Sequence, residues 1–392
     1  MSPDRARHLA IHGGSPVRGD FLPYGRQSIS EADLAAVGEA LRSDWLTTGP
    51  KVGEFEEAVA AAVGAREAVA VSSGTAALHA AVHALGIGPG DEVLVPALTF
   101  AASANCVVFE NATPVFVDVD PDSCNLDPAS LEDAIVATRR AGVLTPRAVI
   151  AVDLFGRPAD YPPLRALARA HGLFLLQDAA QSFGARWQGE PAGRQGDAAA
   201  TSFYPAKPLG AYGDGGAVLT DDPVLAAEIR LLRLHGEQPE RMRYQHLRIG
   251  LNSRLDTLQA AILLVKLEVL EEDLQRRAAL AARYDAALGR LALRPPALPD
   301  GRSAWAQYTI RVPTRDRLRT ALARQGIPTA IYYPIALHRQ PAYHHFPIAP
   351  CGLPVAEALA ATVLSLPMHP DLAAGDQARI IDAVLRFEEK GA

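Results

Sequence analysis

Short runs of apolar residues alternate with longer amphipathic runs along the chain from residue 67 onward. The apolar runs have the length of strands, and the longer runs carry apolar positions at helical spacing. Strands are expected at 67–73, 91–98, 114–119, 147–156 and 173–180, and helices at 75–86, 102–112, 128–140 and 161–172. The alternation predicts an α/β fold with β–α–β units on a mostly parallel sheet. The strands are apolar throughout, which is typical of strands covered on both faces.

Residues at the ends of these runs support the same boundaries. Gly86 and Gly172 stand where a left-handed residue ends a helix, and Pro128 follows Asp127 at a helix start.

The pattern changes after two further short strands and a helix, expected at 197–204, 216–221 and 223–236. Residues 254–288 contain neither Gly nor Pro, which predicts one or two helices totalling roughly 50 Å. The remaining chain predicts a smaller α+β lobe, with a strand at 304–312, a helix at 314–326, a strand at 327–335 and a helix at 374–390.

Composition narrows the kind of partner. The 392 residues carry a net charge of −6, and no basic block of the kind that follows a phosphate backbone occurs, so we expect a small-molecule ligand rather than a nucleic acid. No run of 18 apolar residues and no signal-peptide pattern occurs, which favours a cytoplasmic protein without a membrane segment. The three cysteines have no metal-binding spacing, so buried free thiols are expected.

Three loops that follow strands carry candidate chemistry, because open α/β sheets bind ligands at the carboxyl ends of their strands. In the first, Ser72 to Thr75 lead directly into a helix. Free amides at a helix N-terminus and adjacent hydroxyls can bind a phosphate. The alternative is a simple N-cap by Ser73 or Thr75.

The second loop ends a strand with Asp178 and places Gln181 three residues later. A carboxylate at this position could hold a cationic ring nitrogen. The alternative is a helix cap or a surface ion pair.

The third loop places Lys207 five residues after Ser202, between Pro205 and Pro208 and before a glycine-rich run. Most lysines are solvated surface charges. A lysine held among apolar neighbours has a lowered pKa and is a good imine nucleophile, and glycines let the backbone approach a ligand closely. Together the three loops supply what pyridoxal phosphate needs, namely a phosphate seat, a ring-nitrogen partner and a Schiff-base lysine.

Long motifs extend this interpretation to nearly the whole chain: DWLTTGPKVGEFE, SSGTAALHAAVHALGIGPGDEVLVPALTF, DAAQSFGA, TSFYPAKPLGAYGDGG and GLNSRLDTLQAAIL. In these motifs the sequence resembles the DegT/StrS-type nucleotide-sugar aminotransferases, a branch of the fold-type-I pyridoxal phosphate enzymes. The resemblance implies a large domain with a seven-stranded sheet and a smaller C-terminal domain. It also implies a homodimer with shared active sites, and pyridoxal 5'-phosphate as cofactor with pyridoxamine phosphate as intermediate.

The resemblance also implies roles for individual residues. Lys207 would be the Schiff-base lysine and Asp178 the pyridinium partner, and the two would be the catalytic residues. Asn252 would reach the phosphate of the neighbouring subunit's cofactor. The remaining cofactor contacts would be Gly74, Thr75, Ala76 and Ser202 at the phosphate, Phe100 stacked on the ring and Gln181 near its phenolic oxygen. A core position is the alternative for Phe100.

Within the family, the sequence is most similar to enzymes that aminate the 3-keto group of UDP-2-acetamido-2-deoxy-3-oxoglucuronate with L-glutamate as donor and 2-oxoglutarate as product. Substrate contacts are expected from Arg254, Tyr332 and Tyr333, with Arg248 as a further candidate or a surface arginine. The presence of Lys207 favours transamination over the dehydratase chemistry of relatives with His at this position. Alternatives are an aminotransferase for a deoxysugar or cyclitol, and a non-catalytic regulator that binds the cofactor.

The chain is expected to divide into an N-terminal arm at 1–20, a large cofactor-binding domain at 21–252, and a small domain at 253–392 that includes the long helix. Residues 236–245 are interpreted as a lid. The adjacent His344 and His345 are interpreted as surface residues, and no metal is expected.

Overall fold

The computed structural model describes residues 22–25, 27–238, 244–291, 298 and 300–389. The expected N-terminal arm at 1–20 and the middle of the expected lid, residues 239–243, lie outside the described residues.

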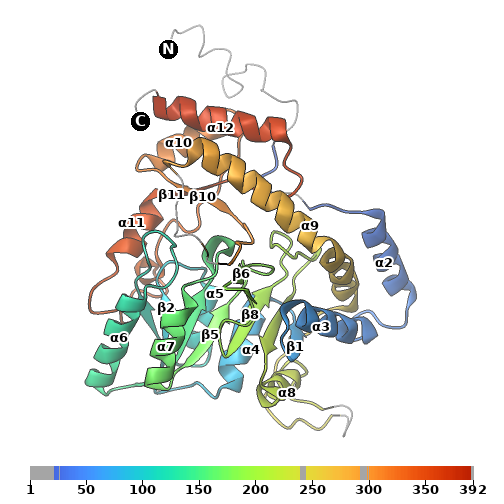
Figure 1. Ribbon diagram of the computed structural model, residues 1–392. Helices are drawn as coiled ribbons and strands as arrows, with labels where there is room; N and C mark the ends of the chain where they lie inside the picture. The colour runs from blue at the N-terminus through green and yellow to red at the C-terminus, as the bar shows by residue number, and fades with distance from the viewer. Residues whose placement is uncertain (1–21, 26, 239–243, 292–297, 299, 390–392) are drawn as a thin grey trace.

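A seven-stranded sheet forms the centre of the large lobe (Figure 1). Its strands lie in the order β1 (Glu67–Val71), β9 (Gly216–Thr220), β8 (Ala198–Ser202), β5 (Phe174–Asp178), β4 (Thr145–Val152), β2 (Asp91–Pro96) and β3 (Thr113–Val117). All neighbouring pairs are parallel except those of β9, which runs antiparallel to β1 and β8. A loop without a crossover helix joins β8 to β9, so the chain must return in the opposite direction. The predicted mostly parallel sheet is confirmed.

Helices cover both faces of this sheet (Figure 1). Within β4, Val149 packs in one core and Ile150 in the other, because successive side chains point to opposite faces. The first core takes α6 (Pro128–Ala141) and α7 (Tyr161–His171), and the second takes α4 (Gly74–Ala84), α5 (Ala102–Phe109) and α8 (Pro223–Leu232).

The expected helix boundaries agree with the cap geometry. Asp127 caps α6 by accepting from the amide of Ser130 at 3.0 Å. Gly172 ends α7 at a φ of 62°, and Gly86 has a φ of 66° after α4.

One long helix, α9 (Thr257–Leu288), links the two lobes. Its 32 residues span about 48 Å at ~1.5 Å per residue. Leu263 packs in a core with α3 (Pro50–Val63), whereas Tyr284 packs in another core with α12 (Ala374–Glu389). Figure 1 shows α9 running from α3 beside the sheet to α10 and α12. The helix α2 (Glu31–Arg42) also contacts it. The hydrophobic pattern did not indicate α2 or α3.

The smaller lobe has a two-stranded antiparallel sheet, β10 (Tyr308–Arg311) and β11 (Val363–Leu366), with α10 (Arg315–Ala323) and α12. The strand expected at 327–335 is absent from the described structure, where only Ala330 forms an isolated bridge, to Ser365. The chain then leaves the sheet edge, and Tyr332 and Tyr333 line a cavity. The smaller elements are α11 (Pro354–Thr362), η2 (Leu154–Gly156), η3 (Leu337–Arg339), β6 (Arg186–Trp187) and β7 (Glu190–Pro191).

One hydrophobic core contains residues from both of the expected domains. The expected domain division remains a prediction. Leu337, Leu353 and Leu359 belong to the same core as β3, β4 and α6. Phe116 of β3 bonds through its amide to Pro347 O at 3.0 Å. We therefore propose that residues around 336–360 belong structurally to the large lobe, although they follow the small lobe's first strand.

The glycine-rich run after Lys207 permits close backbone packing. A Cβ on Gly216 would lie 2.4 Å from the carbonyl carbon and oxygen of Ser73, and a Cβ on Gly74 would lie 2.7 Å from Ser202 Cβ. Gly216 does not have a positive φ, so space rather than backbone conformation requires glycine here. This contact joins β9, β8 and the start of α4.

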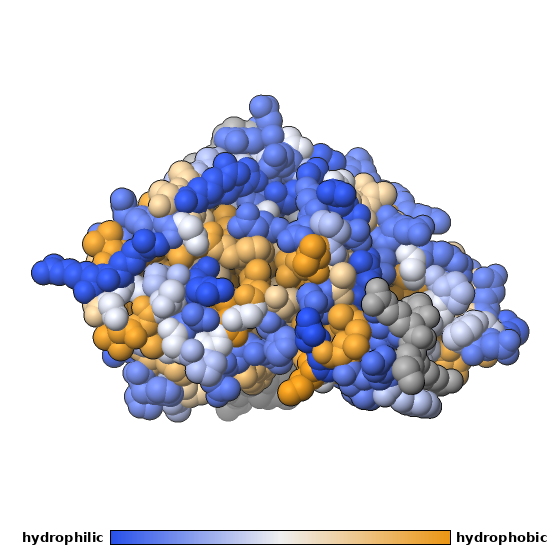
Figure 2. Space-filling view, turned by 90° about the horizontal axis from the view of Figure 1, so that it is seen from below, coloured by the Kyte–Doolittle hydropathy of each residue, from blue (hydrophilic) through white to orange (hydrophobic). Residues whose placement is uncertain are grey.

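The surface has both hydrophilic and hydrophobic areas. Seen from below, hydrophobic residues form separate patches among hydrophilic ones (Figure 2). Large apolar side chains that are exposed include Trp45, Phe100, Tyr204 and Ile249. Among the described residues, no helix is both long enough and apolar enough to cross a membrane.

Gly216→Ala should destabilise the fold by about 1–3 kcal/mol, because the added methyl overlaps backbone atoms that cannot move independently. Urea unfolding followed by circular dichroism measures this. Gly53→Ala in α3 is the control, since a Cβ there meets no atom within 4 Å and Ala in a helix is favoured by about 0.5–1 kcal/mol. Equal stability of the two variants would contradict the packing argument.

Candidate active site

A cavity of about 480 Å³ opens at the carboxyl ends of β5 and β8. This volume lies within the range of about 300–1,000 Å³ typical of small-molecule sites. Its lining brings together nine of the residues expected from sequence: Gly74, Thr75, Phe100, Asp178, Gln181, Ser202, Lys207, Tyr332 and Tyr333.

The N-terminus of α4 forms one end of the cavity. Ser73 is the N-cap, and its side chain accepts from Ala76 N at 3.1 Å. Ser73 therefore does form the N-cap that was considered as the alternative. This cap uses one amide, and the first turn at Gly74 and Thr75 still faces the cavity. Ser202 at the end of β8 lies against Gly74. Amides at a helix N-terminus with a nearby hydroxyl form an anion site.

Asp178 ends β5 and is buried. Ser103 Oγ donates to its Oδ2 at 2.8 Å, and Ala180 N donates to its Oδ1 at 3.2 Å. Burial raises the pKa of Asp178, while these two hydrogen bonds and the charge of Lys207 lower it. The alternatives of a helix cap and a surface ion pair do not describe this buried carboxylate. Ser103 is the second residue of α5, and no signal in the sequence marks it as a site residue.

Lys207 is half-buried in the turn after β8, where its amide bonds to Tyr204 O at 2.8 Å. Burial lowers the pKa of the Lys207 ammonium, and the opposing effect of Asp178 raises it. A lysine with a lowered pKa holds a larger fraction of neutral, nucleophilic amine near neutral pH.

Gln181 forms hydrogen bonds to two segments that are far apart in the sequence. Its Oε1 accepts from Phe155 N at 2.8 Å, and its Nε2 donates to Tyr333 Oη at 3.4 Å. Burial raises the pKa of the Tyr333 phenol, so this group stays protonated. Phe100 is 56% exposed and its ring lies 6.0 Å from that of Tyr333, which excludes the core position considered for Phe100.

Three expected residues do not line this cavity in the single chain. Ala76 gives its amide to Ser73, and Asn252 and Arg254 lie outside the wall. Asn252 is exposed on a segment whose next residue, Ser253, lies 3.3 Å from Ser72 through the hydroxyl oxygens. Arg248 is exposed and pairs with Glu228 at 3.4 Å, which is the surface role considered for it.

The cavity wall also contains residues that were not expected from sequence, among them Tyr204, Ala206, Asp214 and Gln307. Only Lys207 carries a positive charge among the described residues of this wall, and none is an arginine. In the described part of the chain, no group of three or more potential metal ligands comes together.

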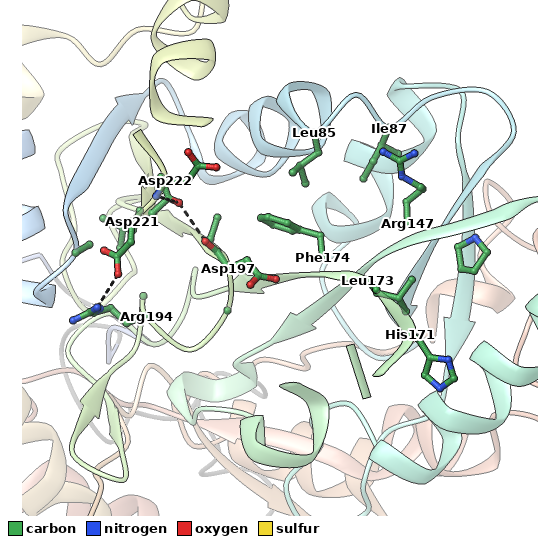
Figure 3. Close-up of a pocket in the computed structure, with 18 of the residues that line it drawn as sticks. Leu85, Ile87, Arg147, His171, Leu173, Phe174, Arg194, Asp197, Asp221 and Asp222 are labelled. Carbon is green, nitrogen blue, oxygen red and sulfur yellow. Dashed lines mark hydrogen bonds and ion pairs between the residues drawn. The ribbon is translucent and has the colours of Figure 1, made fainter. Parts of the chain in front are cut away.

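A larger cavity of about 1010 Å³ lies at the amino ends of β4, β5 and β8 (Figure 3). It contains none of the expected site residues. Asp221 pairs with Arg194 at 2.8 Å, and Asp197 accepts from Leu175 N at 2.8 Å. These carboxylates are used within the fold, so we assign no chemistry to this cavity.

Comparisons with known proteins identify the family. Residues 27–385 match the DegT/DnrJ/EryC1/StrS aminotransferase family. The chain is 44% identical over 341 residues to UDP-2-acetamido-2-deoxy-3-oxo-D-glucuronate aminotransferase of Pseudomonas aeruginosa, covering 86% of this chain and 91% of the relative. It is 43% identical over 358 residues to dTDP-3-amino-3,4,6-trideoxy-alpha-D-glucose transaminase of Streptomyces venezuelae, covering 91% and 92%.

The structure is also similar to a crystal structure of a DegT DnrJ EryC1 StrS aminotransferase from Brucella abortus. The two share 47% sequence identity with a TM-score of 0.88, over 91% of this chain and 95% of the other. The chain belongs to the DegT/DnrJ/EryC1/StrS aminotransferase family. It is an aminotransferase with pyridoxal phosphate as its cofactor, so the resemblance, the fold class and the enzyme class predicted from sequence are confirmed.

A second carboxylate, Asp153, lies directly after β4 and is fully buried. It accepts hydrogen bonds from four groups, one of them on Ser182, the residue after Gln181. Tyr161 Oη and Ala159 N donate to its Oδ1 at 2.7 and 3.0 Å, and Ser182 Oγ and Gln177 Nε2 donate to its Oδ2 at 2.6 and 2.7 Å. Burial raises the pKa of Asp153 to about 6, although these hydrogen bonds lower it.

This pKa predicts a stability change with pH. Between about pH 4 and 6 the folded protein retains a proton on Asp153 that the unfolded chain has lost, so the free energy of unfolding falls as pH rises, by roughly 2–3 kcal/mol in total. In Asp153→Asn, the free energy of unfolding should not show this decrease. Urea unfolding at pH 4.5 and 7 measures it, with the exposed Asp382→Asn as control. A fall in Asp153→Asn as steep as in the control would refute the assignment.

Proposed function

We propose that this aminotransferase transfers an amino group from L-glutamate to the keto group of a nucleotide-linked sugar, with pyridoxamine phosphate as the aminated form of the cofactor. The observation that carries the proposal is the convergence of Lys207, buried Asp178 and the α4 N-terminus with Ser202 on one cavity. The names of the two relatives, a 3-oxo-glucuronate aminotransferase and a trideoxyglucose transaminase, support the sugar as substrate.

The residues fit pyridoxal phosphate by charge and position. The first-turn amides at Gly74 and Thr75, with Ser202, offer an anion seat for its phosphate. Asp178 offers a carboxylate that hydrogen bonds keep in place for the ring nitrogen, and Phe100 offers an exposed ring beside the cavity. When bound, the cofactor supplies an aldehyde that captures amines and a protonated ring that accepts electrons.

The chain's own residues then handle protons and orientation. Lys207, with its lowered pKa, acts as general base and acid and moves a proton through Nζ. The Asp178 carboxylate, held by Ser103 and the Ala180 amide, would keep the proton on the ring nitrogen. Gln181 is held by Phe155 N and Tyr333, so its amide has a fixed orientation before the substrate arrives.

We propose a UDP-linked 3-keto-2-acetamido uronate or a similar sugar as substrate. The principal alternative is a deoxysugar or cyclitol of antibiotic biosynthesis, which the Streptomyces relative favours at nearly equal identity. A product for polysaccharide or glycoconjugate synthesis follows from the first choice.

We propose that active sites are shared in a homodimer, and the charges of the cavity support this. The substrates carry carboxylates and a diphosphate, which bind best to guanidinium groups, yet the described wall of the single chain has no arginine. Asn252 and Arg254 lie outside their own cavity, on a segment beside Ser72. We propose that a second copy supplies these two side chains.

Lys207→Ala should abolish transamination and the visible absorption band of the bound cofactor, because no other amine lines the cavity among the described residues. Absorbance after reconstitution and product formation with L-glutamate measure both effects. Lys266→Ala, on α9 outside the cavity, is the control.

Substrate identity is tested on the wild type with a panel of UDP-3-keto sugars, dTDP-keto-deoxysugars and non-nucleotide ketones. Turnover of the first group alone supports the uronate assignment, and turnover of the second alone supports the alternative. The nucleotide-sugar assignment is wrong if only the third group reacts, and transamination itself is wrong if Lys207→Ala retains full turnover.

Hybrid dimers of two inactive variants, Lys207→Ala and Arg254→Ala, should regain about half of the wild-type activity per dimer, because each hybrid has one intact site of two. Activity is measured after co-expression with two different affinity tags and isolation of doubly tagged dimers. The control combines Lys207→Ala with Asp178→Ala. Both residues line the cavity of their own chain, so these hybrid dimers have no intact site and should stay inactive. Absence of recovery in the first mixture would exclude a shared site.

A further inference from the structure

Gln307 lies on the cavity wall with a polar atom that lacks a partner. It directly precedes β10, is 9% exposed, and its Oε1 has no hydrogen-bond partner among the described residues. A buried amide oxygen without a donor is costly to a fold. Its position in the wall of a ligand cavity indicates that a ligand supplies the donor.

The backbone at Gln307 is held by hydrogen bonds to the turn at Phe155 and Gly156. Gln307 N donates to Phe155 O at 3.4 Å, and Ala304 N donates to Gly156 O at 2.8 Å. Gly156 has a φ of 92°, and a Cβ there would lie 2.7 Å from Ala306 N. Since Phe155 N also donates to Gln181, the same turn fixes Gln307 and Gln181 relative to each other.

The chemistry of this wall suits the sugar rather than the cofactor. The proposed cofactor contacts lie in α4 or follow β2, β5 and β8. Gln307 instead comes from the C-terminal third, together with Tyr332 and Tyr333, whose rings lie 5.7 Å apart. These three side chains are an amide and two phenols and carry no positive charge to bind a phosphate or carboxylate. Hydroxyl and amide groups of a sugar ring match them.

We propose that Gln307 Oε1 accepts a hydrogen bond from a hydroxyl or amide N–H on the sugar ring of the keto substrate, and that it selects sugars bearing this donor. The inference rests on the proposed function. Gln307 is thus a specificity-determining residue that does not act on the donor L-glutamate.

The test compares Gln307→Met, which keeps the size of the side chain without its acceptor, with the control Gln325→Met on the exposed end of the small lobe. In Gln307→Met, kcat/KM for the keto-sugar should fall roughly 10- to 100-fold. The dissociation constant of the aminated product, measured by calorimetry, should rise by a similar factor. The cofactor's visible band and the rate of the half-reaction with L-glutamate should match wild type.

A substrate analogue identifies the donor. With the wild-type enzyme, kcat/KM should be lower by the same factor for the deoxy analogue that lacks the recognised hydroxyl or N–H. Gln307→Met should show no further loss of kcat/KM with this analogue. If Gln307→Met does not fold, Gln307→Ala replaces it in these measurements, because the smaller side chain also lacks the acceptor.

The outcomes separate the two proposals. If wild type converts keto-sugars but Gln307→Met converts them equally well, or loses both half-reactions equally, the role of Gln307 is overturned and the proposed function stands. If wild type and Gln325→Met convert no keto-sugar, the proposed function falls and this inference falls with it.

Discussion

Three backbone segments meet at the carboxyl edge of the sheet, and the rest of the site depends on how closely they approach. Gly216 of β9 packs on Ser73, and Gly74 packs on Ser202 of β8, at distances that no Cβ would allow. This contact sets the N-terminus of α4 beside the end of β8. Because Lys207 lies in the turn that follows β8, the same contact helps to position the lysine relative to the anion seat.

Burial on this scaffold sets the electrostatics. Asp178 and Lys207 are each placed where desolvation disfavours their charged forms, and each partly offsets the effect on the other. Hydrogen bonds from Ser103 and the Ala180 amide hold the carboxylate in one orientation. The site is therefore organised before a ligand binds, which lowers the reorganisation that binding and catalysis require.

Two walls of different origin face each other across the cavity. The sheet supplies the charged and anion-binding groups, whereas the C-terminal third supplies Gln307, Tyr332 and Tyr333. Gln181 and the turn at Phe155 connect the walls by hydrogen bonds.

The sequence by itself determined the alternation of strands and helices, the helix caps and the candidate roles of Asp178, Ser202 and Lys207, because periodicity and residue type act locally. It could not place Ser103 or Gln307, whose importance comes only from what lies opposite them. It also predicted a strand at 327–335 from apolar content, where tertiary packing instead uses the segment to line the cavity. Tertiary structure alone decided these features, since burial and unpaired hydrogen-bonding groups depend on contacts between segments far apart in the chain.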